Sequence, residues 1–193
     1  MALVLDDTAG GTAANTYASL STAETYFLAR PFADVWNAAT ATDALKNQAL
    51  VWATTILDRE KWKGTKGSTP GNALVQAREW PRRWAPTLEY DADPQFVAEY
   101  FIDLSVAFYS SLTIPTPIVN ATCELALEMF RAGATDPLTR DFTRNVKREK
   151  VGALETEYID PWYRVYNLGF FPSVIALVAP LLRSGDGTEV IRG

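Results

Sequence analysis

Histidine is absent from this sequence, and cysteine occurs once, as Cys123. Without histidine the chain lacks the usual general base near neutral pH, the Ser-His and Cys-His nucleophile pairs, and the commonest metal ligand. A single cysteine can form neither an intrachain disulfide nor a thiolate zinc site. Cys123 lies within the apolar run IVNATCELALEMF, which predicts a small buried core residue rather than a nucleophile.

Recognised catalytic and cofactor motifs are missing as well. The carboxylates match no known catalytic spacing, and the sequence contains no glycine-rich dinucleotide fingerprint. The stretch KGTKGSTPGNA has the composition of a phosphate-binding loop, but Lys66 is followed by Gly67 rather than by serine or threonine. We expect a surface loop at this stretch. The sequence therefore predicts a protein that is not an enzyme and has no cofactor or metal.

Basic residues are outnumbered, since 18 Lys and Arg face 23 Asp and Glu and leave a net charge of -5. This balance argues against a general nucleic-acid coat, which is normally basic. The most apolar late run, residues 170–182, is too short to span a bilayer. The start MALVLDDTAGG has no basic segment of the kind that opens a signal peptide. We expect a soluble protein, made in the cytoplasm, without a membrane partner.

Hydrophobic residues make up 48% of the 193 positions, which is enough for one sizeable core. Their spacing predicts a mainly α fold: a compact bundle of four to five helices, with a late β-hairpin and an extended C-terminal tail. We expect a single domain over residues 1–183 and a polar tail over 184–193. The expected helices cover residues 21–30, 42–60, 94–111, 118–132 and 173–182.

Capping residues mark several of these helix ends. Ser21 with Glu24 indicates a capping box, while Thr42 and Ser173 are the expected N-caps of two later helices, and Gly133 is an expected stop. The helix over residues 42–60 also carries an apolar stripe that should face the core, with Thr54 on its opposite face. The stripe consists of Leu45, Ala49, Trp52, Ala53, Ile56 and Leu57.

The stretch EWPRRWAP combines two tryptophans, two prolines and two arginines. One interpretation is a rigid linker whose tryptophans fix it to the helices, with arginines in solvent. The other is a single-strand-binding surface, in which tryptophans stack on bases and arginines contact phosphates. The candidate nucleic-acid contacts in this second interpretation are Trp80, Arg82, Arg83 and Trp84.

A second basic stretch lies within residues 140–150, where five basic residues face Asp141 and Glu149. The five are Arg140, Arg144, Lys147, Arg148 and Lys150. They overlap the segment VKREKVGALETEY, which predicts a hairpin over about residues 143–159 that turns near Gly152. Basic residues on such a hairpin could line a path for DNA or protect an edge strand that is kept for one partner.

Six phrases in order resemble one known family: NTYASLSTAETYF, ALVWATTILD with WKGTK, EWPR, IPTPIVNATCELAL, KREKVGALETEY and PSVIALVAPLL. They resemble the small phage proteins labelled DnaT-like single-stranded-DNA-binding proteins, a group that is similar to the head–tail connector, or adaptor, proteins of tailed phages. The resemblance covers about residues 15–182. One departure is the roughly thirty residues between EWPR and the IP that begins the next helix.

The resemblance implies a structural virion protein at the neck, between head and tail. Such an adaptor would form a homo-oligomeric, dodecameric ring beneath the portal protein. It would extend the channel for double-stranded DNA without reading its sequence, and it would dock a downstream neck or tail protein. In this role the hairpin would be an assembly arm, and Leu154 and Tyr158 join the five basic residues as candidate assembly or DNA-channel contacts. The alternative function is a single-stranded-DNA-binding replication accessory protein.

Overall fold

The computed structural model describes residues 3–67, 75–87, 108–131, 168 and 171–183, together with the backbone of residues 148–151 and 154–157. Its helices are α1 (Leu20–Ala29), α2 (Asp34–Asn37), α3 (Asp43–Leu57), α7 (Thr116–Arg131), α8 (Pro172–Val178) and the short 3-10 helix η4 (Ala179–Leu181). Its strands are β1 (Thr65–Lys66), β2 (Arg82–Arg83), β3 (Arg148–Val151) and β4 (Leu154–Glu157). The predicted fold class, mainly helical with a late antiparallel hairpin, is confirmed.

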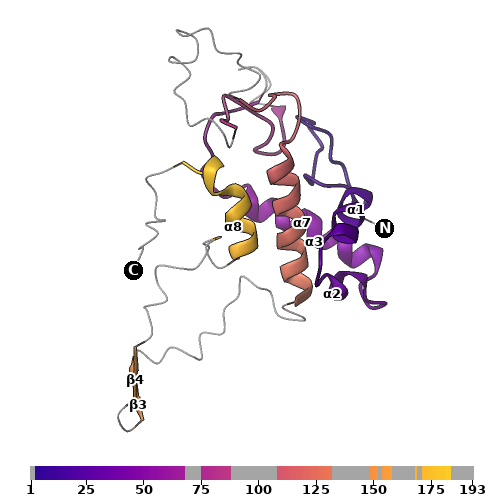
Figure 1. The fold of residues 1–193 in the computed structure, drawn as a ribbon. Coiled ribbons are helices and arrows are strands. Elements are labelled where there is room, and N and C mark those ends of the chain that lie inside the picture. The colour runs from indigo at the N-terminus through magenta and orange to yellow at the C-terminus, as the bar shows by residue number, and fades with distance from the viewer. Residues whose placement is uncertain are drawn as a thin grey trace.

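Helix α7 is the centre of the core. It packs against α3 and α8, and also contacts α1 and α2. In Figure 1, α8 lies on one side of α7, α1 and α2 lie on the other, and α3 crosses behind it. Its residues from Ala121 to Leu127 are all buried, including Cys123, as the apolar run predicted. Burial raises the pKa of the Cys123 thiol to about 12, and the charge of Glu124 acts in the same direction. A thiol in this state is a poor nucleophile.

Helix α3 begins where predicted, but the face that it buries in the core differs from the expected apolar stripe. Thr42 is its N-cap and accepts a hydrogen bond from the backbone N–H of Leu45. Leu45 and Trp52 are 47% and 41% exposed, whereas Thr54, expected on the polar face, is fully buried and bonds the carbonyl of Leu50. The stripe was wrong at these positions because a buried threonine can satisfy its hydroxyl within the helix.

Two other predicted caps are wrong by two residues or less. The N-cap of α1 is Ser19, whose hydroxyl accepts from the backbone N–H of Thr22, so Ser21 already lies inside the helix. In α8 the expected cap Ser173 is helical, because the helix begins at Pro172, a residue suited to a first turn. The expected stop at Gly133 lies outside the described residues.

The first sheet was not predicted. Strands β1 and β2 pair antiparallel, with Thr65 opposite Arg83 and Lys66 opposite Arg82. Strand β1 lies in the stretch expected to be a surface loop, and β2 lies in the stretch EWPRRWAP. Gly64 permits this pairing: its φ is +74°, and a Cβ there would lie 2.5 Å from the carbonyl oxygen of Arg83. Strands of two residues carry no periodic pattern, so the sequence could not indicate them.

The predicted helix over residues 94–111 lies mostly outside the described residues. Its last part is described and is not helical: Phe108 forms an antiparallel bridge with Pro86, and the backbone N–H of Tyr109 donates to Ala85. The late hairpin is confirmed over β3 and β4, whose register aligns Val151 with Leu154. In Figure 1 this hairpin lies apart from the helices.

Candidate functional site

The segment 78–84 contains most of the stretch that the sequence nominated for nucleic-acid contact. Trp80 is only 1% exposed and packs edge-on against Trp62, with ring centroids 5.5 Å apart. In this conformation its ring is closed to a stacking base. The linker interpretation therefore describes Trp80 correctly, since this residue fixes the segment to the core.

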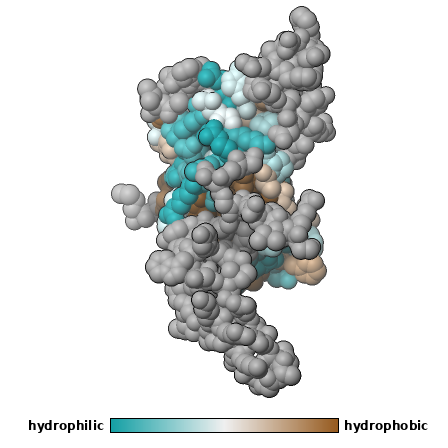
Figure 2. Space-filling model, turned by 90° about the vertical axis from the view of Figure 1, so that its left-hand side faces the viewer, coloured by the Kyte–Doolittle hydropathy of each residue, from teal (hydrophilic) through white to brown (hydrophobic). Residues whose placement is uncertain are grey.

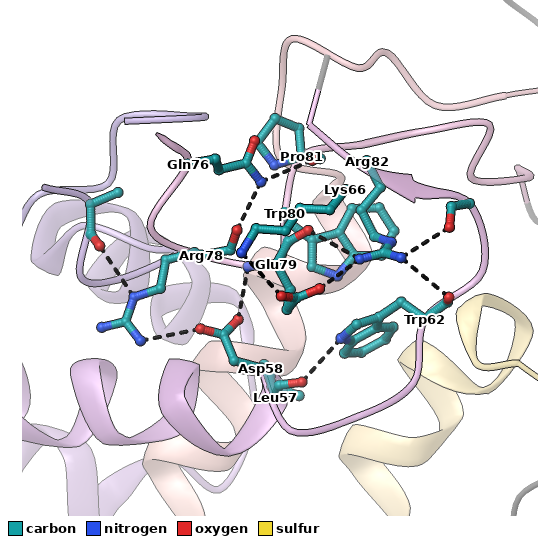
Figure 3. Close-up of polar contacts among 12 residues, drawn as sticks. Leu57, Asp58, Trp62, Lys66, Gln76, Arg78, Glu79, Trp80, Pro81 and Arg82 are labelled. Atoms are coloured by element: carbon teal, nitrogen blue, oxygen red, sulfur yellow. Dashed lines mark hydrogen bonds and ion pairs between the residues drawn. The ribbon is translucent and has the colours of Figure 1, made fainter. Parts of the chain in front are cut away.

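Arg82 is also turned inward, as Figure 3 shows. It is 9% exposed, and its guanidinium donates to the carbonyl oxygens of Lys63 and Gly64, both at 2.9 Å, and to a carboxylate oxygen of Glu79 at 2.7 Å. The other carboxylate oxygen of Glu79 pairs with Lys66 at 3.1 Å. Burial lowers the pKa of Arg82, although Glu79 opposes the shift. Arg82 is thus a structural residue rather than a phosphate contact.

A second polar group holds the start of the segment against α3. The hydroxyl of Tyr17 donates to Asp58 and accepts from the backbone N–H groups of Glu79 and Trp80, at 3.0 and 3.2 Å. Arg78 pairs with the second oxygen of Asp58 at 3.1 Å (Figure 3). Burial, together with the charge of Asp58 and the bond to it, raises the pKa of Tyr17 well above its usual value. The segment is therefore fixed at both ends.

Arg83 and Trp84, the other two nominated residues, lie nearer the surface. Trp84 is 40% exposed and packs edge-on against Phe108 at 5.5 Å, while Arg83 is half-buried on strand β2. The structure thus separates the four candidates into two internal residues and two outer ones.

A basic cluster that sequence reasoning missed lies beside this segment. We use the name basic cluster for Arg59, Lys61, Lys63 and Arg183. The fold brings Arg183 to Lys61 and Lys63 because residues 61–63 and 181–183 run antiparallel: the backbone N–H of Arg183 donates to the carbonyl of Lys61 and that of Lys63 donates to the carbonyl of Leu181, at 2.9 and 2.8 Å. Arg59 precedes Lys61 by two residues. Arg59, Lys61 and Arg183 are exposed and Lys63 is half-buried.

The cluster had a partial signal in the sequence. The stretch DREKWKGTK contains three of the four cluster residues, but Arg183 joins them only through tertiary contacts. Glu60, the acidic residue between Arg59 and Lys61, is half-buried. Burial raises the pKa of its carboxyl group and so favours the neutral form. Figure 2 turns the α8 side of the molecule to the viewer and shows hydrophilic residues gathered there beside hydrophobic ones.

An exposed tryptophan adjoins the basic cluster. The guanidinium carbon of Arg59 lies 5.8 Å from the centre of the Trp52 ring, in a cation–π arrangement. Trp52 is one of the two residues of α3 that were expected in the core and are instead exposed, here at 41%. A cation beside an exposed indole is the pairing that single-strand-binding proteins use for phosphate and base. The structure therefore places an exposed indole and a cation side by side, at a place different from the one the sequence nominated.

The late basic stretch is described only in part. Arg140, Arg144, Lys147 and Tyr158 lie outside the described residues, whereas Arg148, Lys150 and Leu154 lie on the hairpin. The register aligns Arg148 with Glu157 and Lys150 with Glu155. Cross-strand positions favour opposite charges, and the hairpin strands carry two basic and three acidic residues. The hairpin strands are thus not basic overall.

Within the described part of the chain, no group of three or more His, Cys, Asp or Glu residues is placed to hold a metal ion. None of the helices described has both the length and the apolar character needed to cross a membrane.

Comparison with known proteins places the chain in a family. The family model described as "Putative DnaT-like ssDNA binding protein" matches residues 1–193. No curated protein and no solved structure matches the chain at a significant level. Because the family match extends over the whole sequence, the chain belongs to the family described as "Putative DnaT-like ssDNA binding protein".

Proposed function

We propose that the protein binds single-stranded DNA through the basic cluster and the adjoining Trp52. The observation that carries this proposal is the backbone pairing that brings Arg183 beside Lys61 and Lys63, close in sequence to Arg59, which lies over the exposed Trp52 ring. Phosphates supply a charge that this cluster complements, and base stacking on an indole is independent of sequence. The description of the family points to the same ligand.

The proposed binding is electrostatic and without sequence preference. The net charge of -5 confines attraction for DNA to local basic surfaces. Four phosphate contacts on a single strand give a slope of log affinity against log salt of about -3. Affinity should therefore fall steeply as salt is raised, and the four bases should be bound nearly equally.

Reversing two charges of the basic cluster tests the proposal. We expect Lys61→Glu with Lys63→Glu to weaken binding of a fluorescent oligothymidine at least tenfold, measured by anisotropy at low salt, because two phosphate contacts become repulsive. The salt slope should shrink to about -1. The matched control is Lys61→Arg with Lys63→Arg, which keeps both charges and should bind like the unaltered protein. Equal affinity of the reversed variant would exclude the cluster as the binding surface, and no binding by the unaltered protein would exclude the function.

A second candidate function, the ring-forming head–tail adaptor, is supported by the hairpin β3–β4. Two strands alone are marginally stable in water, and the hairpin lies apart from the helices in Figure 1. A sheet of two strands also offers both edges for strand addition. Under this proposal the hairpin is completed by a neighbouring copy or by the portal protein in the neck of the virion.

Charge reversal in the hairpin tests the adaptor proposal. Replacing Arg148 and Lys150 by Glu would put like charges across from Glu157 and Glu155, which destabilises a strand pair. We expect loss of ring formation, seen by light scattering and negative-stain images with portal present, while the helical circular dichroism stays unchanged. Adding Glu155→Lys and Glu157→Lys restores opposite charges and should restore assembly. An unaltered protein that stays monomeric with portal, and shows no rings, would contradict this function.

A further inference from the structure

A pocket of about 440 Å³ lies between α3 and the C-terminal end of α7. Its walls include Leu45, Gln48, Ala49 and Trp52 of α3 and Met129 and Phe130 of α7. The volume is within the range of pockets that hold small organic molecules. It is therefore large enough for a planar ring the size of a nucleobase.

The pocket exists because α3 keeps two large apolar residues out of the core. Leu45 and Trp52 remain partly exposed on the outer face of the helix, one on either side of Gln48. A flat indole wall suits a flat aromatic ligand, and the amide of Gln48 can both donate and accept a hydrogen bond at a ring edge. The lining thus combines a stacking face with a polar group that tolerates different bases.

Charge favours a nucleotide over an apolar protein side chain as the occupant. Arg59 lies over the Trp52 ring, so a base stacked on Trp52 would bring its phosphate near this guanidinium. Lys46, which lies 5.5 Å from the centre of the Trp36 ring, already pairs with Glu24 at 3.4 Å and does not line the pocket. Arg59 is therefore the cation beside the Trp52 wall, and it precedes Lys61 and Lys63 of the basic cluster by two and four residues.

We propose that this pocket, the Trp52 pocket, receives one base of a bound single strand. The base stacks on Trp52 with its edge towards Gln48, and the strand continues over Arg59 to the basic cluster. This inference rests on the proposed function, single-stranded-DNA binding, and assigns it a base-binding subsite.

Removing the indole tests the subsite. We expect Trp52→Ala to weaken binding of oligothymidine about 5- to 150-fold in anisotropy titrations, the range for loss of one stacked base. Trp52→Phe keeps an aromatic face and should retain most of the affinity. Leu112→Ala, at an exposed leucine outside the pocket, is the control for loss of surface apolar area. Thermal unfolding of each variant checks that the fold is intact.

Photocrosslinking supplies a second readout that does not depend on affinity. An oligonucleotide that carries 5-iodouracil should crosslink to the tryptic peptide of residues 47–59, which contains Trp52. Binding that persists in Trp52→Ala but is lost in Trp84→Ala, with crosslinks elsewhere, would overturn the subsite and leave the proposed function standing. An unaltered protein that binds no oligonucleotide would overturn both. If that protein also self-associates, and Trp52→Ala dissociates it, the pocket is a protein contact instead.

Discussion

Arg82→Met is expected to lower the free energy of unfolding by about 3 to 5 kcal/mol, the usual cost of removing one partner from a buried ionic group. The substitution leaves the carbonyl oxygens of Lys63 and Gly64 without their donor, and it leaves a carboxylate oxygen of Glu79 without its cation. The Glu79 carboxylate is 31% exposed and keeps its pair with Lys66, so the main loss falls on the two carbonyl oxygens. The whole connection between α3 and β2 should therefore loosen.

Chemical unfolding followed by circular dichroism measures this effect. Arg83→Met, one residue further along the same strand, is the matched control and should cost less than about 1 kcal/mol, as for most outer positions. Arg82→Lys should fall between the two, because an ammonium group keeps the charge but cannot reproduce the fork of bonds. If Arg82→Met left stability unchanged and weakened only DNA binding, Arg82 would be a ligand contact, as the second of the two sequence interpretations holds.

Arg82 also shows what the sequence alone could not predict. The stretch EWPRRWAP left two interpretations open, and the choice depended on partners distant in sequence: Trp62 beside Trp80, and the carbonyl groups of residues 63 and 64 around Arg82. No local pattern carries such information. In contrast, α3 and α7 could be predicted because their cores follow the helical period along a continuous segment.

The site formed by Trp52 and the basic cluster could not be predicted from the sequence for a related reason. Periodicity assigned Trp52 to the core, because a large aromatic residue on an apolar stripe is usually buried. The structure fills that interior place with other residues of α3, among them Leu50 and Thr54, and leaves the indole outside beside Arg59. The basic cluster also needed the fold, since Arg183 meets Lys61 across about 120 residues of chain. Which residues remain exposed for function thus depends on which of their neighbours are buried in the core.

A buried ionic group on α7 should have an effect of similar size. Glu124 is 2% exposed, and its carboxylate accepts from the Arg30 guanidinium, with one bond of 2.8 Å, and from the Tyr26 hydroxyl at 2.7 Å. These bonds tie the end of α1 to the central helix. We expect Glu124→Ala to cost about 3 to 5 kcal/mol in unfolding free energy, because Arg30 would lose its carboxylate and keep only its bond to the carbonyl of Pro31.

Helix α7 carries a matched control one turn further on. Glu128 pairs with Arg131 at 2.6 Å, but this pair lies at the surface. Glu128→Ala should therefore cost less than about 1 kcal/mol. Equal losses in the two variants would mean that burial adds nothing to the Glu124 bonds.

The contribution of Glu124 should also depend on pH, in a direction set by its pKa. Burial alone would raise the pKa of Glu124, but the bonds from Arg30 and Tyr26 outweigh it and hold the pKa below the usual 4.5. A carboxyl group whose pKa is lower in the folded state stabilises the fold above its unfolded pKa and loses this contribution as pH falls through the folded value. The stability gap between the unaltered protein and Glu124→Gln should therefore be constant from neutral pH to about 5 and narrow below 4.5. Urea unfolding at a series of pH values measures the gap, and a gap that widened on acidification would contradict a carboxylate held by Arg30 at this position.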